Sequence, residues 1–256
     1  MIFDSHMHTK FSADSEMLAK DAITKAQNLG LGVVFTEHFD FDLPGDIDFT
    51  FSPEDYWKEY QPLRSKSVRL GVEIGMEKIA RQPAAEFLKR APFDLVIGSI
   101  HLVDRFDIYY PDFYEGKDKE TAYHKYFKAM IEESSAGDFD ILAHIDYICR
   151  AAPYENPEID YVTFKSDIDE VLKIIIEREK VLELNTRRFN TRRGIKELVP
   201  IYNQYKNLGG KYVTIGSDAH KVEAVGNYFD LAVEFAQEIG LIIVTFCQRK
   251  LEICNI

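Results

Sequence analysis

Two histidines, two positions apart, stand close to the N-terminus in the sequence Ile2-Phe3-Asp4-Ser5-His6-Met7-His8. Because alternate side chains of an extended strand point to the same face, His6 and His8 would project together from the end of a first strand. Two neutral imidazoles in this arrangement can share one metal ion. The motif by itself is weak, since a chance pairing near a chain terminus would look the same.

The positions of the other histidines strengthen this interpretation. Only His124 falls in the middle of an expected helix, whereas short apolar runs typical of buried parallel strands precede His38, His101, His144 and His220. In a parallel α/β barrel all strand carboxyl ends open on one face, where catalytic groups gather. Six imidazoles converging there without a cation would be an unfavourable arrangement of buried polar groups. Their joint placement therefore predicts a metal centre.

Three carboxylates complete the predicted centre. Glu73 closes an apolar run, Asp218 follows another, and Asp14 lies in the loop beyond the first strand. A helix over residues 16–29 offers an alternative role for Asp14, or for Ser15, as its N-terminal cap. Six histidines with three carboxylates exceed one tetrahedral site and suffice for two or three ions that share a bridging carboxylate. Nitrogen and oxygen ligands without thiolate suit Zn²⁺, Mn²⁺ or Fe.

The elements that position these residues alternate along the chain as apolar strand, polar loop and amphipathic helix. The expected strands are residues 2–3, 32–35, 68–72, 95–98, 139–143, 181–184 and 212–215, with two short strands in the tail 241–256. The expected helices are residues 16–29, 118–135, 162–178, 196–208 and 227–239. This alternation predicts βαβ units and a parallel sheet. About seven such units favour an α/β fold with a single domain over residues 1–256, a closed or nearly closed TIM-like barrel rather than an open sheet.

The composition limits the classes of function. A formal net charge of −12 argues against nucleic acid as the main partner, since phosphate backbones attract Lys/Arg-rich surfaces, but it leaves room for a small phosphorylated substrate. No apolar run approaches the roughly 18 residues of a membrane span, so no membrane partner is expected. Three cysteines without framework spacing, and no signal-peptide pattern, favour a reducing cytoplasm. The oligomeric state stays open.

The ordered motifs resemble those of the polymerase-and-histidinol-phosphatase (PHP) family of metal-dependent phosphoesterases. The resemblance spans the whole chain and rests on His6-Met7-His8, Asp14, Glu37-His38, Gly71-Val72-Glu73, Gly98-Ser99-Ile100-His101, Ala143-His144-Ile145-Asp146 and Gly216-Ser217-Asp218-Ala219-His220. It implies a distorted seven-stranded barrel and a trinuclear metal centre. The implied metal sites are His6, His8, Glu73 and Asp218 for the first, Glu73 as a bridge with His101 and His144 for the second, and Asp14, His38 and His220 for the third.

Such a centre would hydrolyse a phosphate monoester. A water that bridges two divalent ions loses its proton near neutral pH and can attack phosphorus in line, without a covalent enzyme intermediate. Glu73 would bridge the ions, and Asp218, His220 or a metal-bound water would protonate the leaving alkoxide. The candidates for substrate contacts are Arg192 and then Arg193 on a phosphate oxygen, with His101 beside them. A solvated basic loop is the alternative for these arginines.

Within the family, the histidinol-phosphate phosphatase branch is the most similar. The resemblance lies in the run 98–104 and in Asn185-Thr186 followed by Arg192-Arg193, Glu197 and Pro200. It implies hydrolysis of L-histidinol phosphate to L-histidinol and phosphate, a step of histidine biosynthesis. The segment 187–191 departs from the small, glycine-containing turn of that branch. A nucleotide, sugar phosphate or phosphotyrosine peptide therefore remains an alternative substrate, and a non-catalytic metal-binding accessory domain is a third alternative.

Two further sets of acidic residues flank the predicted centre. Glu37 and Asp4 are candidates for orienting the ligand imidazoles. The acidic and aromatic loop over residues 39–56, which begins with Phe39-Asp40, could contact a cationic part of the substrate or be an ordinary solvated loop.

Overall fold

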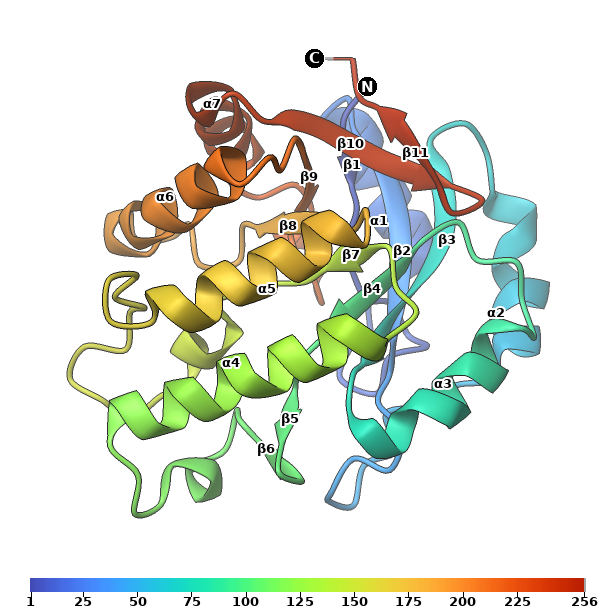
Figure 1. Cartoon of the computed structure of the whole chain (residues 1–256). Coiled ribbons are helices and arrows are strands. Elements are labelled where there is room, and N and C mark those ends of the chain that lie inside the picture. The colour runs from blue at the N-terminus through green and yellow to red at the C-terminus, as the bar shows by residue number, and fades with distance from the viewer. Residues whose placement is uncertain (256) are drawn as a thin grey trace.

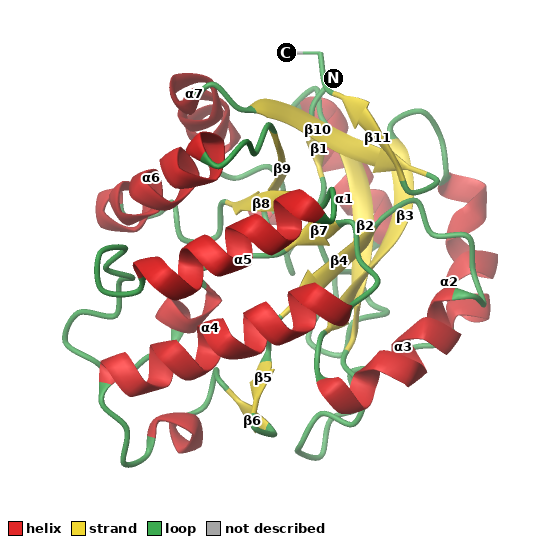
Figure 2. Ribbon diagram, in the orientation of Figure 1, coloured by secondary structure: helices red, strands yellow, loops and turns green. Residues whose placement is uncertain are grey.

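A nine-stranded sheet forms the centre of the computed structural model, which describes residues 1–255 without the side chain of Arg192 (Figures 1 and 2). The seven strands expected from the apolar runs are present and pair in parallel in chain order. They are β1 (Phe3–Asp4), β2 (Gly32–Phe39), β3 (Val68–Gly75), β4 (Val96–Ser99), β7 (Ile141–Leu142), β8 (Val181–Asn185) and β9 (Tyr212–Gly216).

The expected tail strands extend this sheet. β10 (Ile242–Cys247) pairs in parallel with β9, and β11 (Lys250–Ile253) pairs antiparallel with β10. The mixed α/β fold with a mainly parallel sheet is thus confirmed, and the sheet has nine strands rather than seven because this hairpin is added at its end.

Backbone hydrogen bonds also connect the segment after β1 with the end of β9. Ser5 N donates to Ile215 O at 2.9 Å, and His8 N donates to Ala219 O at 2.8 Å. The backbone of Asp218 donates in the opposite sense, to His6 O at 2.8 Å. These bonds fix residues 5–8 beside residues 215–219, two segments that carry predicted metal ligands.

Helices lie outside the sheet (Figure 2). Five match expected helices: α1 (Ala19–Asn28), α4 (Lys119–Ala136), α5 (Lys165–Glu177), α6 (Arg192–Asn207) and α7 (Phe229–Ile239). Figure 1 shows α4 and α5 side by side, and the two helices pack together. Among the described helices, none combines the length and the apolar character needed to span a bilayer.

Two short helices and one hairpin have no counterpart among the elements expected from the sequence. The helices are α2 (Pro53–Tyr60) and α3 (Arg81–Leu88), and the hairpin consists of β5 (Leu102–Val103) and β6 (Phe106–Asp107). Ser52 Oγ caps α2 by accepting from Asp55 N at 3.2 Å, with proline in the first turn, so the expected loop 39–56 ends at residue 52. Helix α1 begins at Ala19 with Leu18 at the cap position, so neither Asp14 nor Ser15 caps it.

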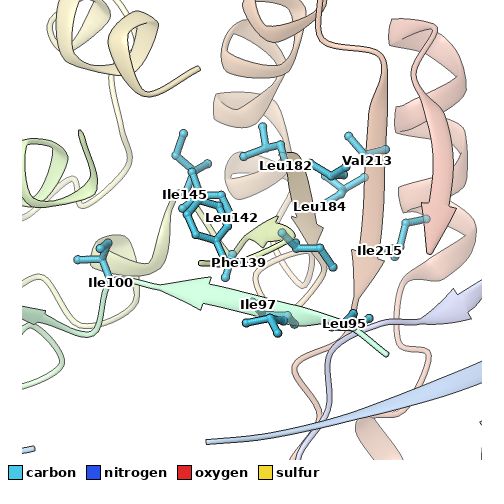
Figure 3. Packing of buried hydrophobic residues seen from close by; sticks show 14 of the residues in the cluster. Leu95, Ile97, Ile100, Phe139, Leu142, Ile145, Leu182, Leu184, Val213 and Ile215 are labelled. Carbon is cyan, nitrogen blue, oxygen red and sulfur yellow. The ribbon is translucent and has the colours of Figure 1, made fainter. Parts of the chain in front are cut away.

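Apolar side chains of neighbouring strands hold the sheet together. Figure 3 shows one cluster with residues of β4, β7, β8 and β9, among them Ile97, Leu142, Leu182 and Val213. All four are completely buried. Burial of one such side chain stabilises the fold by about 1.5–3 kcal/mol. The cluster therefore gives the strand ends a rigid base from which functional side chains project.

Candidate metal centre and substrate cavity

The predicted ligands gather at the carboxyl ends of the parallel strands. His6 and His8 follow β1, and the register of β2 with β3 places His38 opposite Glu73. The other predicted ligands lie just beyond strand ends, with Asp14 in the loop before α1: they are His101 after β4, His144 after β7, and Asp218 and His220 after β9. Almost all of them are buried, and Asp14 is the most exposed of the set, at 41% of its side chain.

Four ligand atoms converge at the first predicted site. His6 Nε2 lies 3.2 Å from His8 Nε2 and 3.2 Å from Glu73 Oε2. Asp218 Oδ1 lies 3.5 Å from His8 Nε2 and 4.0 Å from His6 Nε2. The two nitrogens lie close together, with one oxygen of Glu73 and one of Asp218 within 4.0 Å of each, so a single cation could be shared by these groups.

Glu73 connects this site with the second. Its Oε1 lies 3.0 Å from His144 Nε2 and 3.4 Å from His101 Nε2, and it accepts a hydrogen bond from Ser99 Oγ at 2.5 Å. Its Oε2 lies 3.0 Å from His38 Nδ1. One carboxylate therefore has histidine nitrogens beside both of its oxygens, as a bridging ligand requires.

The third predicted set is more open. Asp14 Oδ2 lies 3.0 Å from His220 Nε2 and 3.7 Å from His38 Nε2. The His8 ring stacks on His38 with centroids 4.0 Å apart and lies 4.3 Å from the His220 ring. Nitrogens of these three histidines also come within 4.8 Å of one another, so they form a further possible ligand group.

Two carboxylates that the sequence analysis did not assign as orienting groups fix the orientation of ligand rings. Glu183 Oε1 accepts from His6 Nδ1 at 2.7 Å, and Asp40 Oδ1 accepts from His101 Nδ1 at 2.7 Å. With Nδ1 protonated, each ring turns a lone pair on Nε2 toward the centre. Both carboxylates are buried. Burial alone would raise the pKa of Asp40, but the contact with His101 lowers it to about 2.

Glu37 acts on a ligand through a hydroxyl group. Ser12 Oγ donates to Glu37 Oε2 at 2.7 Å, so it accepts from His8 Nδ1 at 3.1 Å. This series of hydrogen bonds leaves the lone pair of His8 on Nε2, which faces the centre as well. Asp4 instead accepts from Ser217 N and Oγ, at 2.9 and 2.6 Å, and so holds the turn that carries Asp218.

The donor set fits divalent metal ions. Glu73 Oε2 is buried without a hydrogen-bond partner among the described residues, although histidine nitrogens surround it at 3.0–3.3 Å. Lone pairs on His6 and His8 face the same point, and buried lone pairs that face one another without a hydrogen or a cation are unfavourable. Burial opposes charge on His38, but Glu73 and Asp40 raise its pKa to about 10. The centre thus favours positive charge, which metal ions would supply.

A cavity of about 290 Å³ opens over the predicted ligands. Two arginines reach into it: Arg187 Nη1 donates to Asp218 Oδ1 at 3.0 Å, and Arg150 Nη1 donates to Asp218 Oδ2 at 3.2 Å. Although burial opposes ionisation, Arg187, His6 and Arg150 hold the pKa of the Asp218 carboxyl well below its usual range. The cavity is also lined by apolar and aromatic side chains, namely Leu43, Ile47, Phe49, Tyr109 and Tyr110.

The arginines chosen from the sequence do not coincide with this pair. Arg193 is exposed in the first turn of α6 and does not line the cavity, and the side chain of Arg192 lies outside the described residues. Arg187 lies in the segment 187–191 that departs from the turn of the histidinol-phosphate phosphatase branch, whereas no pattern pointed to Arg150. Glu183 carried the same signal as Glu73, a carboxylate within an apolar strand.

The family model for the PHP domain matches residues 4–187, which include seven of the nine predicted ligands. This chain belongs to the PHP domain family. The remaining two predicted ligands, Asp218 and His220, lie beyond the matched range, and the structure brings them to the same centre.

PHP relatives match nearly the whole chain. A probable histidinol-phosphatase from Clostridium acetobutylicum is 42% identical over 98% of this chain and 99% of its own length. A histidinol-phosphatase from Lactococcus lactis is 33% identical over 85% of this chain and 83% of its own length. A crystal structure of histidinol phosphate phosphatase from Lactococcus lactis, complexed with zinc, L-histidinol and phosphate, superimposes with a TM-score of 0.91 at 30% identity and covers 98% of both chains.

Proposed function

We propose that this PHP protein hydrolyses a phosphate monoester with the help of two or three divalent metal ions, and that its substrate is L-histidinol phosphate. The products would be L-histidinol and phosphate, as a step of histidine biosynthesis. The full-length similarity to proteins named histidinol-phosphatase supports this substrate, as does the complex of the Lactococcus lactis protein with zinc, L-histidinol and phosphate.

The observation that carries the proposal is the convergence of histidines on both oxygens of Glu73 beneath a cavity that holds two arginines. Zinc, manganese or iron fits this set of nitrogen and oxygen donors. Divalent ions bound there would activate water and neutralise negative charge on the phosphoryl group. We assign the ions to the nine predicted ligands: His6, His8, Asp14, His38, Glu73, His101, His144, Asp218 and His220.

The side chains around the ions would bind and orient the substrate. Arg150 and Arg187 would hold phosphate oxygens through charge-assisted hydrogen bonds, the role that the sequence analysis gave to Arg192 and Arg193. The low pKa of Asp218 favours its carboxylate form, which suits a ligand and an anchor for both arginines better than a proton donor. Of the proton donors predicted from the sequence for the leaving alkoxide, His220 and a metal-bound water then remain.

The apolar and aromatic side chains that line the cavity suit the imidazole part of the leaving group. Tyr109 and Tyr110 offer aromatic faces, and Leu43 and Ile47 line the same cavity. Of the expected acidic loop, Asp40 lines the cavity but is bonded to His101, and Asp42 is paired with Arg105. We therefore assign recognition of the leaving group mainly to apolar contact rather than to this acidic loop.

The fold and location complete the proposal. We infer that the bonds between residues 5–8 and 215–219 close the seven parallel strands into a distorted barrel, and that residues 1–256 act as one domain. The cysteines of the described chain are all free thiols, which supports work in a reducing cytoplasm.

A substrate panel with controlled metal content tests the function. The metal-depleted protein should be inactive, and addition of zinc, manganese or iron should restore turnover. The restored enzyme should show its highest kcat/KM with L-histidinol phosphate among nucleotides, sugar phosphates, phosphotyrosine peptide and p-nitrophenyl phosphate. Full activity without metal would exclude the proposed chemistry, and a higher kcat/KM for another phosphate would exclude the proposed substrate.

A further inference from the structure

Arg188 follows Arg187 in the chain but does not line the cavity, and its side chain is mostly buried in a network of ion pairs. Its Nη1 donates to Asp146 Oδ2 at 2.6 Å, and its Nη2 donates to both carboxylate oxygens of Glu158 at 2.7 Å. Only 16% of the Arg188 side chain is exposed, against 8% for Asp146 and 10% for Glu158. Burial opposes the charge, but the two carboxylates raise the pKa of Arg188, so it stays charged.

The two carboxylates lie at two points of the connection between β7 and α5. Asp146 directly precedes a 3₁₀ turn over Tyr147–Arg150, and the side chains at both ends of this turn line the cavity. Glu158 lies in the connection before α5, where its backbone oxygen accepts from Lys119 Nζ of α4 at 2.5 Å. One guanidinium group thus ties the segment after β8 to two points of the connection between β7 and α5.

The segment after β8 and the segment after β7 each carry an arginine that reaches Asp218. Arg187, next to Arg188, reaches Asp218 from the segment after β8, and Arg150 reaches it from the segment after β7. The distance between the two cavity arginines therefore depends on how these segments are held together. A planar guanidinium can hold carboxylates in two directions at once, whereas an ammonium group is a point charge.

We propose that Arg188 is a positioning residue that sets the geometry of the phosphate-binding arginines, an inference that rests on the proposed function. It does not touch the substrate. It holds the segments of Arg187 and Arg150 at the spacing at which both guanidinium groups converge on one phosphate. Since misplacement of binding groups by about 1 Å can reduce turnover about 100-fold, loss of this link should be visible in phosphate binding.

Substitution of Arg188 by lysine separates this role from stability. Lysine retains a buried positive charge, but one ammonium group cannot bond Asp146 and Glu158 in the observed directions. Because the cavity arginines bind phosphate in both substrate and product, Arg188→Lys should raise KM and weaken inhibition by inorganic phosphate at least tenfold, with a smaller change in kcat. A purely structural role would lower the active fraction, and so the apparent kcat, without altering either constant.

Three further variants sharpen the test. Glu158→Gln, which keeps the shape of the side chain, should weaken phosphate binding in the same sense but less strongly. In an Arg187→Ala background the effect of Arg188→Lys should shrink, since the group that Arg188 positions is already missing. Arg90→Lys, at an exposed arginine that pairs with Glu54 and does not line the cavity, is the matched control and should behave as the wild type.

Calorimetric titration of the metal-loaded protein with inorganic phosphate makes the test independent of the substrate. A wild type that binds phosphate, with Arg188→Lys at least tenfold weaker, supports the positioning role whichever monoester is hydrolysed. Affinities and KM values of Arg188→Lys and Glu158→Gln within twofold of the wild type would overturn it. A wild type that turns over no phosphate monoester would instead refute the proposed function.

Discussion

Replacement of Glu183 by glutamine should weaken metal binding although Glu183 is not itself a predicted ligand. Its Oε1 accepts from His6 Nδ1 at 2.7 Å, and its Oε2 accepts from the backbone N–H of His144 at 2.8 Å. The carboxylate therefore receives a hydrogen at each oxygen and needs no donor of its own. It is also buried, with 1% exposure, so water cannot replace either bond.

A glutamine cannot satisfy both neighbours. If its oxygen faces His6, its amide group meets the His144 N–H donor to donor, which leaves a buried donor unpaired at about 1–3 kcal/mol. If its amide group faces His6, the imidazole proton must move to Nε2, the atom that faces Glu73 and His8. Either orientation disturbs a ligand, and loss of such an orienting partner lowers metal affinity by about 10- to 100-fold. That range corresponds to about 1.4–2.7 kcal/mol.

The affinity can be measured by competition. Metal-depleted wild type and Glu183→Gln would be titrated with zinc in the presence of a chromogenic chelator, and thermal unfolding at saturating zinc would show that the variant is folded. Glu170→Gln, on the exposed face of α5, makes the same chemical change away from the centre and should leave the zinc affinity unchanged.

A folded Glu183→Gln variant that binds zinc within twofold of the wild type would refute this role of Glu183. In that case the contact of Glu183 with His6 would not determine which ring nitrogen of His6 carries the proton. A weaker affinity in Glu170→Gln as well would point to a general charge effect rather than to a lost hydrogen bond.

Other changes should have distinct effects. Arg150→Ala or Arg187→Ala should each weaken inhibition by phosphate about 10- to 150-fold, the value of a charged hydrogen bond of about 1.5–3 kcal/mol, and an unchanged inhibition constant would contradict the assignment. Burial raises the pKa of the Cys149 thiol to about 12, so iodoacetamide at pH 8 should label the half-buried Cys247 of native protein long before Cys149, as mass spectrometry would show. Arg249→Ala removes the ion pairs of the β10–β11 turn and should lower the free energy of unfolding by about 1–3 kcal/mol in urea titrations, whereas an unchanged midpoint would show these pairs to be dispensable.

The sequence predicted most of the architecture because its signals are local. Each of the seven parallel strands expected between residues 2 and 215 is a largely buried apolar run, and the register of a parallel sheet brings the residues at their carboxyl ends together. Helices α2 and α3 were missed because each has only eight residues. The hairpin of β5 and β6, which leads to Tyr109 and Tyr110, has strands of two residues, too short for any alternation to be visible.

The partners of the ligand rings were harder to predict because they depend on tertiary contacts. His6 and Glu183 lie 177 positions apart, and His101 and Asp40 lie 61 positions apart. A carboxylate in a buried strand can be recognised as unusual from sequence, but the imidazole that it orients cannot. Gly216 shows how close the packing is, since an added Cβ would lie 2.4 Å from Glu183 Oε1.

The position of a residue relative to the end of its strand would have predicted which arginine reaches the cavity. His6, His101, His144 and Asp218 each stand two residues beyond the last residue of a strand, and Arg187 has the same relation to β8. Thr191 Oγ1 caps α6 by accepting from Gly194 N at 3.1 Å, so the helix begins at Arg192 rather than near residue 196. Arg192 and Arg193 thus belong to a helix, whereas Arg187 and Arg188 lie just beyond the end of β8. Since side chains just beyond parallel strands face the common centre, the end of β8 identifies Arg187 as the arginine that reaches the substrate cavity.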